Sequence, residues 1–266
     1  MNLVHHDFCL PAFEPQRALE KALLQPACSD NRLSWESLAA TATIVLATTG
    51  GSIRTIVTGR RVITTGVYAS RKSGRAQPYE SMIERAFFMH CEVDTDVVDY
   101  AAQPFRFEFV IGGTKRAYIV DAITLRSDGT VEIVEIKNDR RALRDPDYRL
   151  KLSAVREICE AVGWRFRIVF RSDLFEPVEA HRAVEDVQSW AFTEYRTADV
   201  FEVVRQLRAH GRLPLGKLAE CLGERLLGIA KLKAMMVARV VRLDLTSIPN
   251  HSTTVTLVDG SREEIQ

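Results

Sequence analysis

Along the middle of the chain, apolar positions recur first at helical spacing and then in alternation. Between Tyr79 and Cys91 the apolar side chains return every three or four residues, which is typical of an amphipathic helix. From Phe105 to Phe109 three phenylalanines alternate with Arg106 and Glu108. This alternation predicts a strand with one buried face.

Two further strands are predicted on either side of a tight turn. They run from Ala117 to Leu125 and from Val131 to Lys137, and Asp128-Gly129 lies between them. Asp-Gly tolerates the positive φ angles that a short hairpin turn requires. An amphipathic helix over residues 150–162 and a strand over 165–170 follow. The order strand, helix, strand predicts a right-handed crossover and a mixed sheet.

The pattern changes after Pro177. Helices are predicted over 198–209, 215–222 and 225–241, and strand-like runs over 241–245 and 253–258. Three helices and a hairpin favour a winged helix-turn-helix. The third helix is either a recognition helix for the major groove or a charged helix that faces a protein partner. Its basic residues are Arg225, Lys231, Lys233 and Arg239.

Composition narrows the class of protein without deciding its function. The 266 residues are 46% apolar and 27% charged, which is ordinary for a soluble globular protein. The net charge of +1 argues neither for nor against a nucleic-acid partner. The five cysteines include no Cys-x-x-Cys pair, so neither zinc nor a disulfide framework is expected. The sequence contains no run of 18 or more apolar residues, and we expect no signal peptide and a cytoplasmic protein without a membrane partner.

Candidate chemistry lies on the predicted hairpin. Asp121 is expected opposite about residue 136, and Glu135 and Lys137 share the strand face that also carries Val131 and Ile133. Two carboxylates and a lysine at the end of an apolar face suit a Mg²⁺ site for phosphodiester hydrolysis. The alternative is an exposed strand edge, where Glu-x-Lys is common. Glu84, on the preceding helix, would complete the cluster or be a surface residue, with Glu80 and Glu92 as competitors.

These residues resemble the PD-(D/E)xK nuclease superfamily. More closely, the stretch from Val67 to Leu174 is similar to the TnsA endonuclease of heteromeric cut-and-paste transposons. Position 120 departs from the superfamily pattern, because it is Val where Pro is expected, and residues 1–50 show no match. Four segments carry the resemblance: Tyr79-Glu80-Ser81-Met82-Ile83-Glu84-Arg85, Asp96-Val97-Val98-Asp99-Tyr100 before Gln103-Pro104, Tyr118-Ile119-Val120-Asp121, and Val134-Glu135-Ile136-Lys137.

The resemblance implies a role for each matching residue. Glu84 corresponds to the first acidic residue, Asp121 and Glu135 to metal-binding carboxylates, and Lys137 to the catalytic lysine. The backbone carbonyl of Ile136 would add a metal ligand. The implied cofactor is Mg²⁺, with Mn²⁺ as a substitute. Gln103 is expected to be structural.

The resemblance also implies a fold and two domains. We expect an α/β restriction-endonuclease-like mixed sheet flanked by helices, with a C-terminal winged-helix-like α domain. The endonuclease domain would span residues 1–176, of which 1–50 carry no readable chemistry. A winged-helix-like domain that binds a partner or DNA would span 177–266.

Basic residues near the candidate site are possible DNA contacts, with a solvated loop as the alternative. The segment 54–75 contains no acidic residue, which suits a phosphate backbone. A second basic group follows Lys137 directly. The predicted DNA-binding residues are Arg71, Lys72, Arg75, Arg140 and Arg141.

The function implied is hydrolysis of the non-transferred strand at the 5′ ends of a transposon. The expected partners are double-stranded DNA, a DDE transposase and an AAA+ transposition regulator. A stand-alone restriction-like or resolvase-like nuclease is the rival enzyme. A catalytically silent DNA-binding adaptor is the rival from another class, although the complete set of acidic residues and lysine argues against it.

Overall fold

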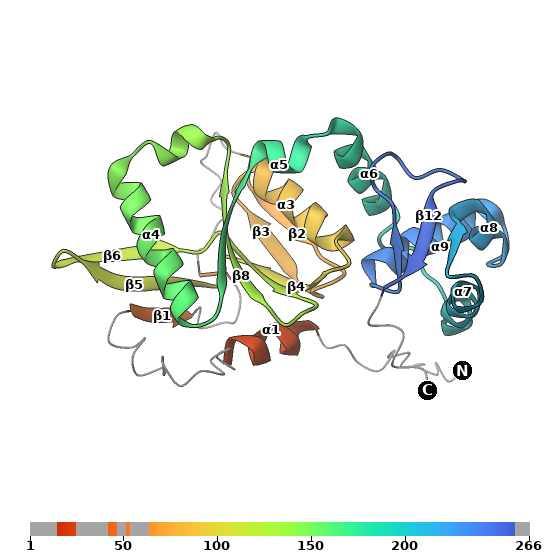
Figure 1. The fold of residues 1–266 in the computed structure, drawn as a ribbon, viewed down its shortest axis with the longest axis horizontal. Coiled ribbons are helices and arrows are strands. Elements are labelled where there is room, and N and C mark those ends of the chain that lie inside the picture. Colours follow the sequence, from red (N-terminus) through yellow and green to blue (C-terminus); the bar gives the residue numbers. More distant parts are fainter. Residues whose placement is uncertain (1–14, 25–41, 47–51, 54–63, 259–266) are drawn as a thin grey trace, which may run out of the picture.

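The computed structural model describes residues 15–24, 42–46, 52–53 and 64–258. A strand-rich part lies at one end of the described chain and a smaller helical part at the other (Figure 1). Among the residues described, no helix is long and apolar enough to cross a membrane. The candidate residues on the predicted hairpin belong to the strand-rich part.

Four strands form the central sheet, in the order β4-β7-β8-β9. They are β4 (Val97–Ala102), β7 (Ala122–Arg126), β8 (Val131–Lys137) and β9 (Arg165–Phe170). The first three are antiparallel, whereas β8 and β9 are parallel. Parallel neighbours need a crossover, which α4 (Pro146–Ala161) provides. The predicted mixed sheet is therefore confirmed.

A second antiparallel sheet joins β1 (Ala42–Leu46), β5 (Phe105–Ile111) and β6 (Thr114–Ile119). The alternation predicted for β5 is confirmed, since Phe105 and Phe107 are fully buried. The single strand predicted from Ala117 to Leu125 is wrong, because the chain leaves β6 at Ile119 and enters β7 at Ala122. Val120 is buried and continues the apolar run, so the sequence pattern does not show where the chain passes from one sheet to the other. Asp121 lies at this passage, between β6 and β7.

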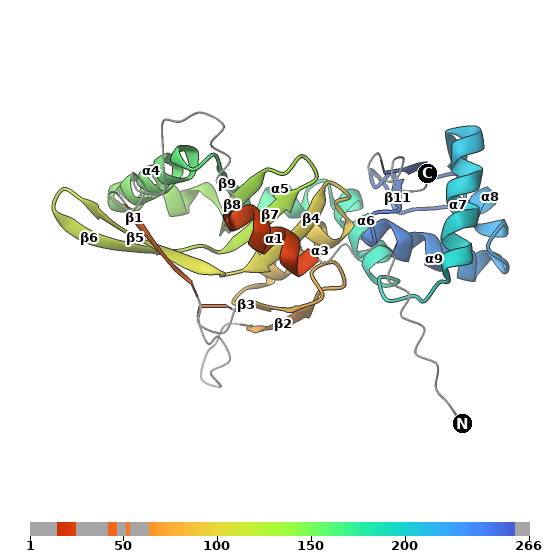
Figure 2. The ribbon, with the colours of Figure 1, turned by 90° about the horizontal axis from the view of Figure 1, so that it is seen from below.

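Helices cover both faces of the central sheet (Figure 2). On one face, α3 (Met82–Val93) and α5 (Arg171–Phe175) pack over a core that includes Phe88, Tyr100 and Val134. On the other, α1 (Pro15–Leu24) and α4 share a core with Ile133 and Val155. A small hairpin of β2 (Gly66–Ala69) and β3 (Ala76–Tyr79) precedes α3. The central strands are thus buried on both sides.

The C-terminal part contains the predicted helices and strands in the predicted order. They are α7 (Thr197–His210), α8 (Leu215–Glu220), α9 (Arg225–Val237), β11 (Val241–Leu243) and β12 (Thr254–Leu257). Two elements were not predicted, α6 (Val178–Gln188) and β10 (Arg212–Pro214). β10 completes a three-stranded sheet in the order β10-β12-β11. Met89 and Val93 of α3 join the core of this part, and the domain boundary at residue 176 stays a prediction.

The two lysines of α9 are paired inside the protein, whereas Arg225 at the start of the helix is exposed and pairs with Glu220. Lys231 is buried and its Nζ lies 3.0 Å from Asp199 Oδ2, and buried Lys233 lies 2.6 Å from Asp186 Oδ2. The guanidinium Nε of Arg239, just beyond α9, donates to the carbonyl of Thr95 at 2.9 Å. These pairings count against the recognition-helix interpretation, because Lys231, Lys233 and Arg239 already have protein partners, although Arg225 stays exposed.

Candidate active site

The β7–β8 hairpin brings Asp121 and Glu135 together. Ala122 of β7 pairs with Val134 of β8. Asp121, the residue before Ala122, therefore lies next to Glu135, the residue after Val134. The turn uses Gly129 at φ +81°, a conformation that glycine adopts without strain. Asp121 Oδ2 accepts a hydrogen bond from the backbone N–H of Ile136 at 2.8 Å. The predicted approach of Asp121 to residue 136 is confirmed.

Glu135 is buried, with 2% of its side chain exposed, and it is surrounded by donors. The ammonium of Lys137 lies against Glu135 Oε1, and the hydroxyl of Tyr148 donates to the same oxygen. The hydroxyl of Tyr118 donates to Oε2. Lys137 Nζ is also 3.9 Å from Asp121 Oδ2. One lysine therefore serves two neighbouring carboxylates.

The electrostatics show a surplus of negative charge. Burial and, after it, the neighbouring Glu135 carboxylate raise the pKa of Asp121 to about 8, while Lys137 opposes the shift. Burial alone would lower the pKa of Lys137, but Glu135 and Asp121 hold it above its ordinary value. Two close carboxylates of this kind favour either a shared proton or a cation.

Glu84 lies in the first turn of α3 and within electrostatic reach of the Asp121–Glu135 pair. Ser81 caps the helix by accepting from the backbone N–H of Glu84 at 3.2 Å. The Glu84 carboxylate in turn accepts from the backbone N–H of Glu80 at 2.8 Å and from the Ser81 hydroxyl at 3.0 Å. Burial raises the pKa of Glu84, and the charge of Lys137 acts against that rise. Glu84 therefore stabilises the helix start as well as adding a third carboxyl group near Lys137.

The competitors of Glu84 have other environments. Glu92 is buried and accepts hydrogen bonds from the hydroxyls of Ser70 and Tyr100. Glu80 contributes its backbone N–H to Glu84. Gln103 is structural, as predicted: it adopts φ +43° before Pro104 and donates its N–H to the backbone carbonyl of Asp121 at 3.0 Å. It thereby fixes the strand end from which Asp121 projects.

Asp121 and Glu135 are the carboxylates that this site offers to a divalent cation. Within the described ranges, no group of three or more His, Cys, Asp and Glu side chains is arranged to hold a metal ion. Asp121 and Glu135 nevertheless offer adjacent carboxylate oxygens, and Mg²⁺ keeps several waters and needs only one or two carboxylates. Their chemistry therefore fits Mg²⁺. The Ile136 carbonyl as a ligand stays a prediction.

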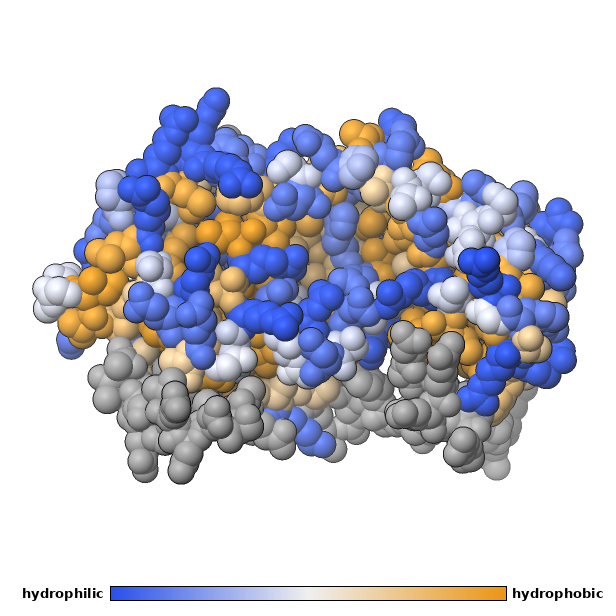
Figure 3. Space-filling view, in the orientation of Figure 1, coloured by the Kyte–Doolittle hydropathy of each residue, from blue (hydrophilic) through white to orange (hydrophobic). Residues whose placement is uncertain are grey.

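Arg140 and Arg141 are exposed beside the site. They begin a short 3-10 helix, η1 (Arg140–Leu143), which directly follows β8 and is capped by Asp139. Arg140 lies over the Phe170 ring, 5.0 Å from its centroid. Hydrophilic side chains project over η1 and the start of α4 at the upper left of Figure 3. This position leaves both arginines accessible to a DNA backbone.

Arg71, Lys72 and Arg75 point into the protein instead. Lys72 is buried and donates to the carbonyls of Cys91 and Asp94, both at 2.7 Å. Arg75 pairs with buried Asp99 at 3.4 Å, and Arg71 donates to the carbonyls of Ala191 and Thr193. Their basic pattern predicted DNA contacts, but the geometry assigns them internal partners. The rest of that segment, residues 54–63, lies outside the described residues.

Two residues beside Glu135 were not predicted as part of the site. Tyr118 lies on β6 and Tyr148 in the first turn of α4. Burial, and then the Glu135 carboxylate, raise the pKa of both hydroxyls, so both remain protonated donors. The available signal was a tyrosine three residues before Asp121 and another soon after the Glu-x-Lys strand.

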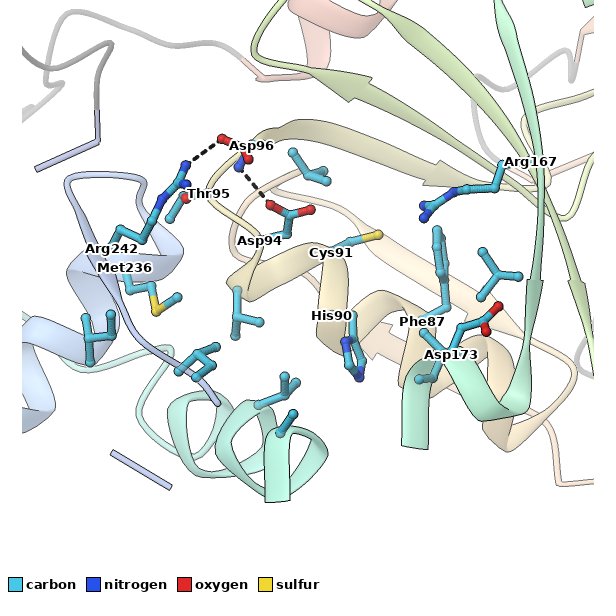
Figure 4. A pocket seen from close by; sticks show the side chains of 18 residues that line it. Phe87, His90, Cys91, Asp94, Thr95, Asp96, Arg167, Asp173, Met236 and Arg242 are labelled. Carbon is cyan, nitrogen blue, oxygen red and sulfur yellow. Dashed lines mark hydrogen bonds and ion pairs between the residues drawn. The ribbon is translucent and has the colours of Figure 1, made fainter. Parts of the chain in front are cut away.

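A pocket of about 420 Å³ lies away from these residues, between α3 and the C-terminal part (Figure 4). His90, Asp94 and Arg242 are among the residues that line it. Arg242 pairs with Asp96 at 2.6 Å, and Arg126 with Asp94 at 3.2 Å. The pocket does not include the Asp121–Glu135 pair, so the chemistry identified above does not depend on it.

Residues 94–170 match the family model described as "TnsA-like endonuclease N terminal". This stretch is TnsA-like. The resemblance seen in the sequence is thereby confirmed over the TnsA-like stretch, which contains Asp121, Glu135 and Lys137 but not Glu84. Among curated proteins no match was found. A TnsA-like stretch indicates an endonuclease associated with DNA transposition, and it implies a DNA substrate and a transposase partner.

Proposed function

We propose that the chain is a Mg²⁺-dependent DNA endonuclease of a cut-and-paste transposition system. It hydrolyses the non-transferred strand at the 5′ transposon ends, together with a DDE transposase. One observation carries the proposal: in the TnsA-like stretch, Asp121 and Glu135 lie side by side and share Lys137. Glu84 adds a third carboxyl group within electrostatic reach.

Each residue has a chemical task in this proposal. Asp121 and Glu135 would hold the divalent ion, which when bound supplies a nucleophilic water and neutralises phosphoryl charge. Lys137 orients the attacking water and offsets the charge that develops in the transition state. The N–H of Ile136 fixes Asp121 Oδ2. Arg140 and Arg141 receive the phosphate backbone on the exposed side of the site.

The C-terminal part is proposed to be a winged-helix-like partner domain. The order α7-β10-α8-α9-β11-β12 is helix, strand, helix, helix, strand, strand. Because the lysines of α9 are paired internally, we assign this part to a protein partner and not to base recognition. An AAA+ transposition regulator is the partner that the resemblance implies.

The decisive experiment is nicking of supercoiled plasmid with Mg²⁺ or Mn²⁺, with and without the candidate transposase. Wild type is compared with Asp121→Asn and Lys137→Met. Glu132→Gln is the matched control, because Glu132 lies on the same strand but pairs with Arg167 at 3.0 Å. We expect metal-dependent nicking that both site variants lose and the control keeps.

The outcomes separate the candidate functions. Nicking that appears only with the transposase supports the transposition role. Vigorous cutting of plain duplex DNA without a partner would favour a stand-alone nuclease instead. No cleavage under any condition, with DNA binding retained, would leave the adaptor function.

A further inference from the structure

Both carboxylate oxygens of Glu135 have assigned donors. Oε2 accepts from the Tyr118 hydroxyl, and Oε1 accepts from the Tyr148 hydroxyl and contacts the Lys137 ammonium. The ammonium also lies 5.4 Å from the centroid of the Tyr148 ring, within the range of a cation–π contact. The orientation of Glu135 is therefore set by side chains that the proposed chemistry has not used.

The two tyrosines reach Glu135 from different layers of the fold. Tyr118 is 4% exposed and belongs to β6, in the sheet beside the central one. Tyr148 is half-buried at the start of α4, directly after the exposed arginines of η1. Because separate elements converge on one carboxylate, packing within a single element does not explain the arrangement.

The carboxylate oxygens of Glu135 and Asp121 have some acceptor positions left for a cation. A carboxylate oxygen accepts about two hydrogen bonds. Glu135 Oε1 has two partners and Oε2 has one. Asp121 Oδ2 accepts from Ile136 and faces Lys137. With respect to the part of the chain that the structure describes, the remaining acceptor positions lie on Glu135 Oε2 and on Asp121 Oδ1.

We propose that Tyr118 and Tyr148 are positioning residues that make Glu135 offer a single oxygen, Oε2, to the divalent cation. Tyr148 also keeps the Lys137 ammonium beside the carboxylates. This inference rests on the proposed function. Without the two hydroxyls, the Glu135 carboxylate rotates and pairs more fully with Lys137, which weakens cation binding and draws the ammonium away from the attacking water.

The test measures Mn²⁺ binding by isothermal titration calorimetry, without DNA. The variants are Tyr118→Phe, Tyr148→Phe and the double variant. Loss of the side chains that orient a metal ligand typically lowers metal affinity about 10- to 100-fold, and we expect that loss in the double variant. Tyr100→Phe is the matched control, because it removes a hydroxyl that donates at 2.7 Å to Glu92, a buried carboxylate outside the site. The control should bind Mn²⁺ as wild type does.

The results distinguish this inference from the proposed function. Tyrosine variants that bind Mn²⁺ as tightly as wild type, while Asp121→Asn loses binding, overturn the positioning role alone. A folded wild type that neither binds metal nor cuts DNA overturns the proposed function itself. Since Tyr148 is half-exposed, Tyr148→Phe keeps the test decisive even where Tyr118→Phe fails to fold. Unfolding in urea, measured alongside, separates loss of affinity from loss of stability.

Discussion

Buried charges are balanced in the C-terminal part but not at the candidate active site. In the C-terminal part, Lys231 pairs with Asp199 at 3.0 Å and Lys233 with Asp186 at 2.6 Å. Burial alone would raise the pKa of Asp199, but the backbone N–H of Arg196 and the ammonium of Lys231 lower it. At the site, Asp121 and Glu135 share Lys137, Glu84 adds negative charge within electrostatic reach, and the pKa of Asp121 is raised to about 8.

The opposite pKa directions indicate different purposes for the two regions. A carboxylate matched by its own lysine is satisfied as a charged group and contributes to the fold. A carboxylate that must share a lysine is stabilised by a further cation. Perturbed groups of the second kind are typical of functional sites. Removing one charge at a time from either region should break this contrast.

The largest effect on cleavage is expected from Lys137→Met. Removing a preorganised group that stabilises transition-state charge lowers the rate of cleavage about 100- to 1,000-fold. The fold should survive, because Lys137 is partly exposed and the carboxylates it leaves can take up protons. Single-turnover nicking measures the cleavage rate, and circular dichroism measures whether the fold survives. Cleavage at the wild-type rate would remove Lys137 from the site.

Lys231→Met should affect stability and not chemistry. It leaves Asp199 buried without its lysine, which typically costs about 3–5 kcal/mol. Urea unfolding measures the loss. The double variant Lys231→Met, Asp199→Leu should recover most of it, because the unpaired charge is gone. A double variant as unstable as the single one would contradict the balanced-pair interpretation.

His90 makes stability depend on pH. Burial, and then the neighbouring His181, lower the pKa of His90 from 6.5 to about 4. His90 therefore binds fewer protons in the folded state than in the unfolded state between these values, so its contribution to stability falls as pH drops through that window, whereas the raised pKa of Asp121 acts in the opposite direction. Between pH 7 and pH 5 the loss is about 2 kcal/mol. Urea unfolding at both pH values should show this loss as a change in the difference in unfolding free energy between wild type and His90→Gln, whereas exposed His210→Gln should differ from wild type by the same amount at both.

The smallest effects concern DNA binding. In a plot of the logarithm of DNA affinity against the logarithm of salt concentration, Arg140→Ala should make the slope shallower by about one unit. The reason is that the Arg140 guanidinium is exposed beside the site. Arg71→Ala should leave that slope unchanged, since Arg71 bonds to backbone carbonyls of the C-terminal part. Binding titrations at several salt concentrations test both. Equal slopes for wild type and Arg140→Ala would remove Arg140 from the DNA contact.

The sequence predicted what depends on local pattern. The Asp128-Gly129 turn and the alternation along β8 were enough to bring Asp121 beside Glu135, and the ends of β9 were predicted correctly. The break between β6 and β7 was not, because buried Val120 keeps the run apolar where the chain changes sheets. Local periodicity carries no information about which sheet a strand joins.

What the sequence could not predict depends on partners distant in the chain. Lys72 appeared free because its acceptors, the carbonyls of Cys91 and Asp94, belong to the end of α3. Lys231 appeared exposed because Asp199 lies on another helix. Tyr118 and Tyr148 flank Glu135 only after two layers pack together. A basic or aromatic pattern gives the chemistry of a side chain but not the direction in which it points.

The most direct test of the central claim is calorimetric titration of the wild type, Asp121→Asn and exposed Glu108→Gln with Mn²⁺. The surplus negative charge at Asp121 and Glu135 should bind Mn²⁺. At a free Mn²⁺ concentration 100 times the dissociation constant, the unfolding free energy of the wild type should rise by about 2.7 kcal/mol. We expect Asp121→Asn to lose both the heat of binding and the gain, and Glu108→Gln to keep both. Binding that Asp121→Asn leaves unchanged, or no binding to the wild type, would contradict the account.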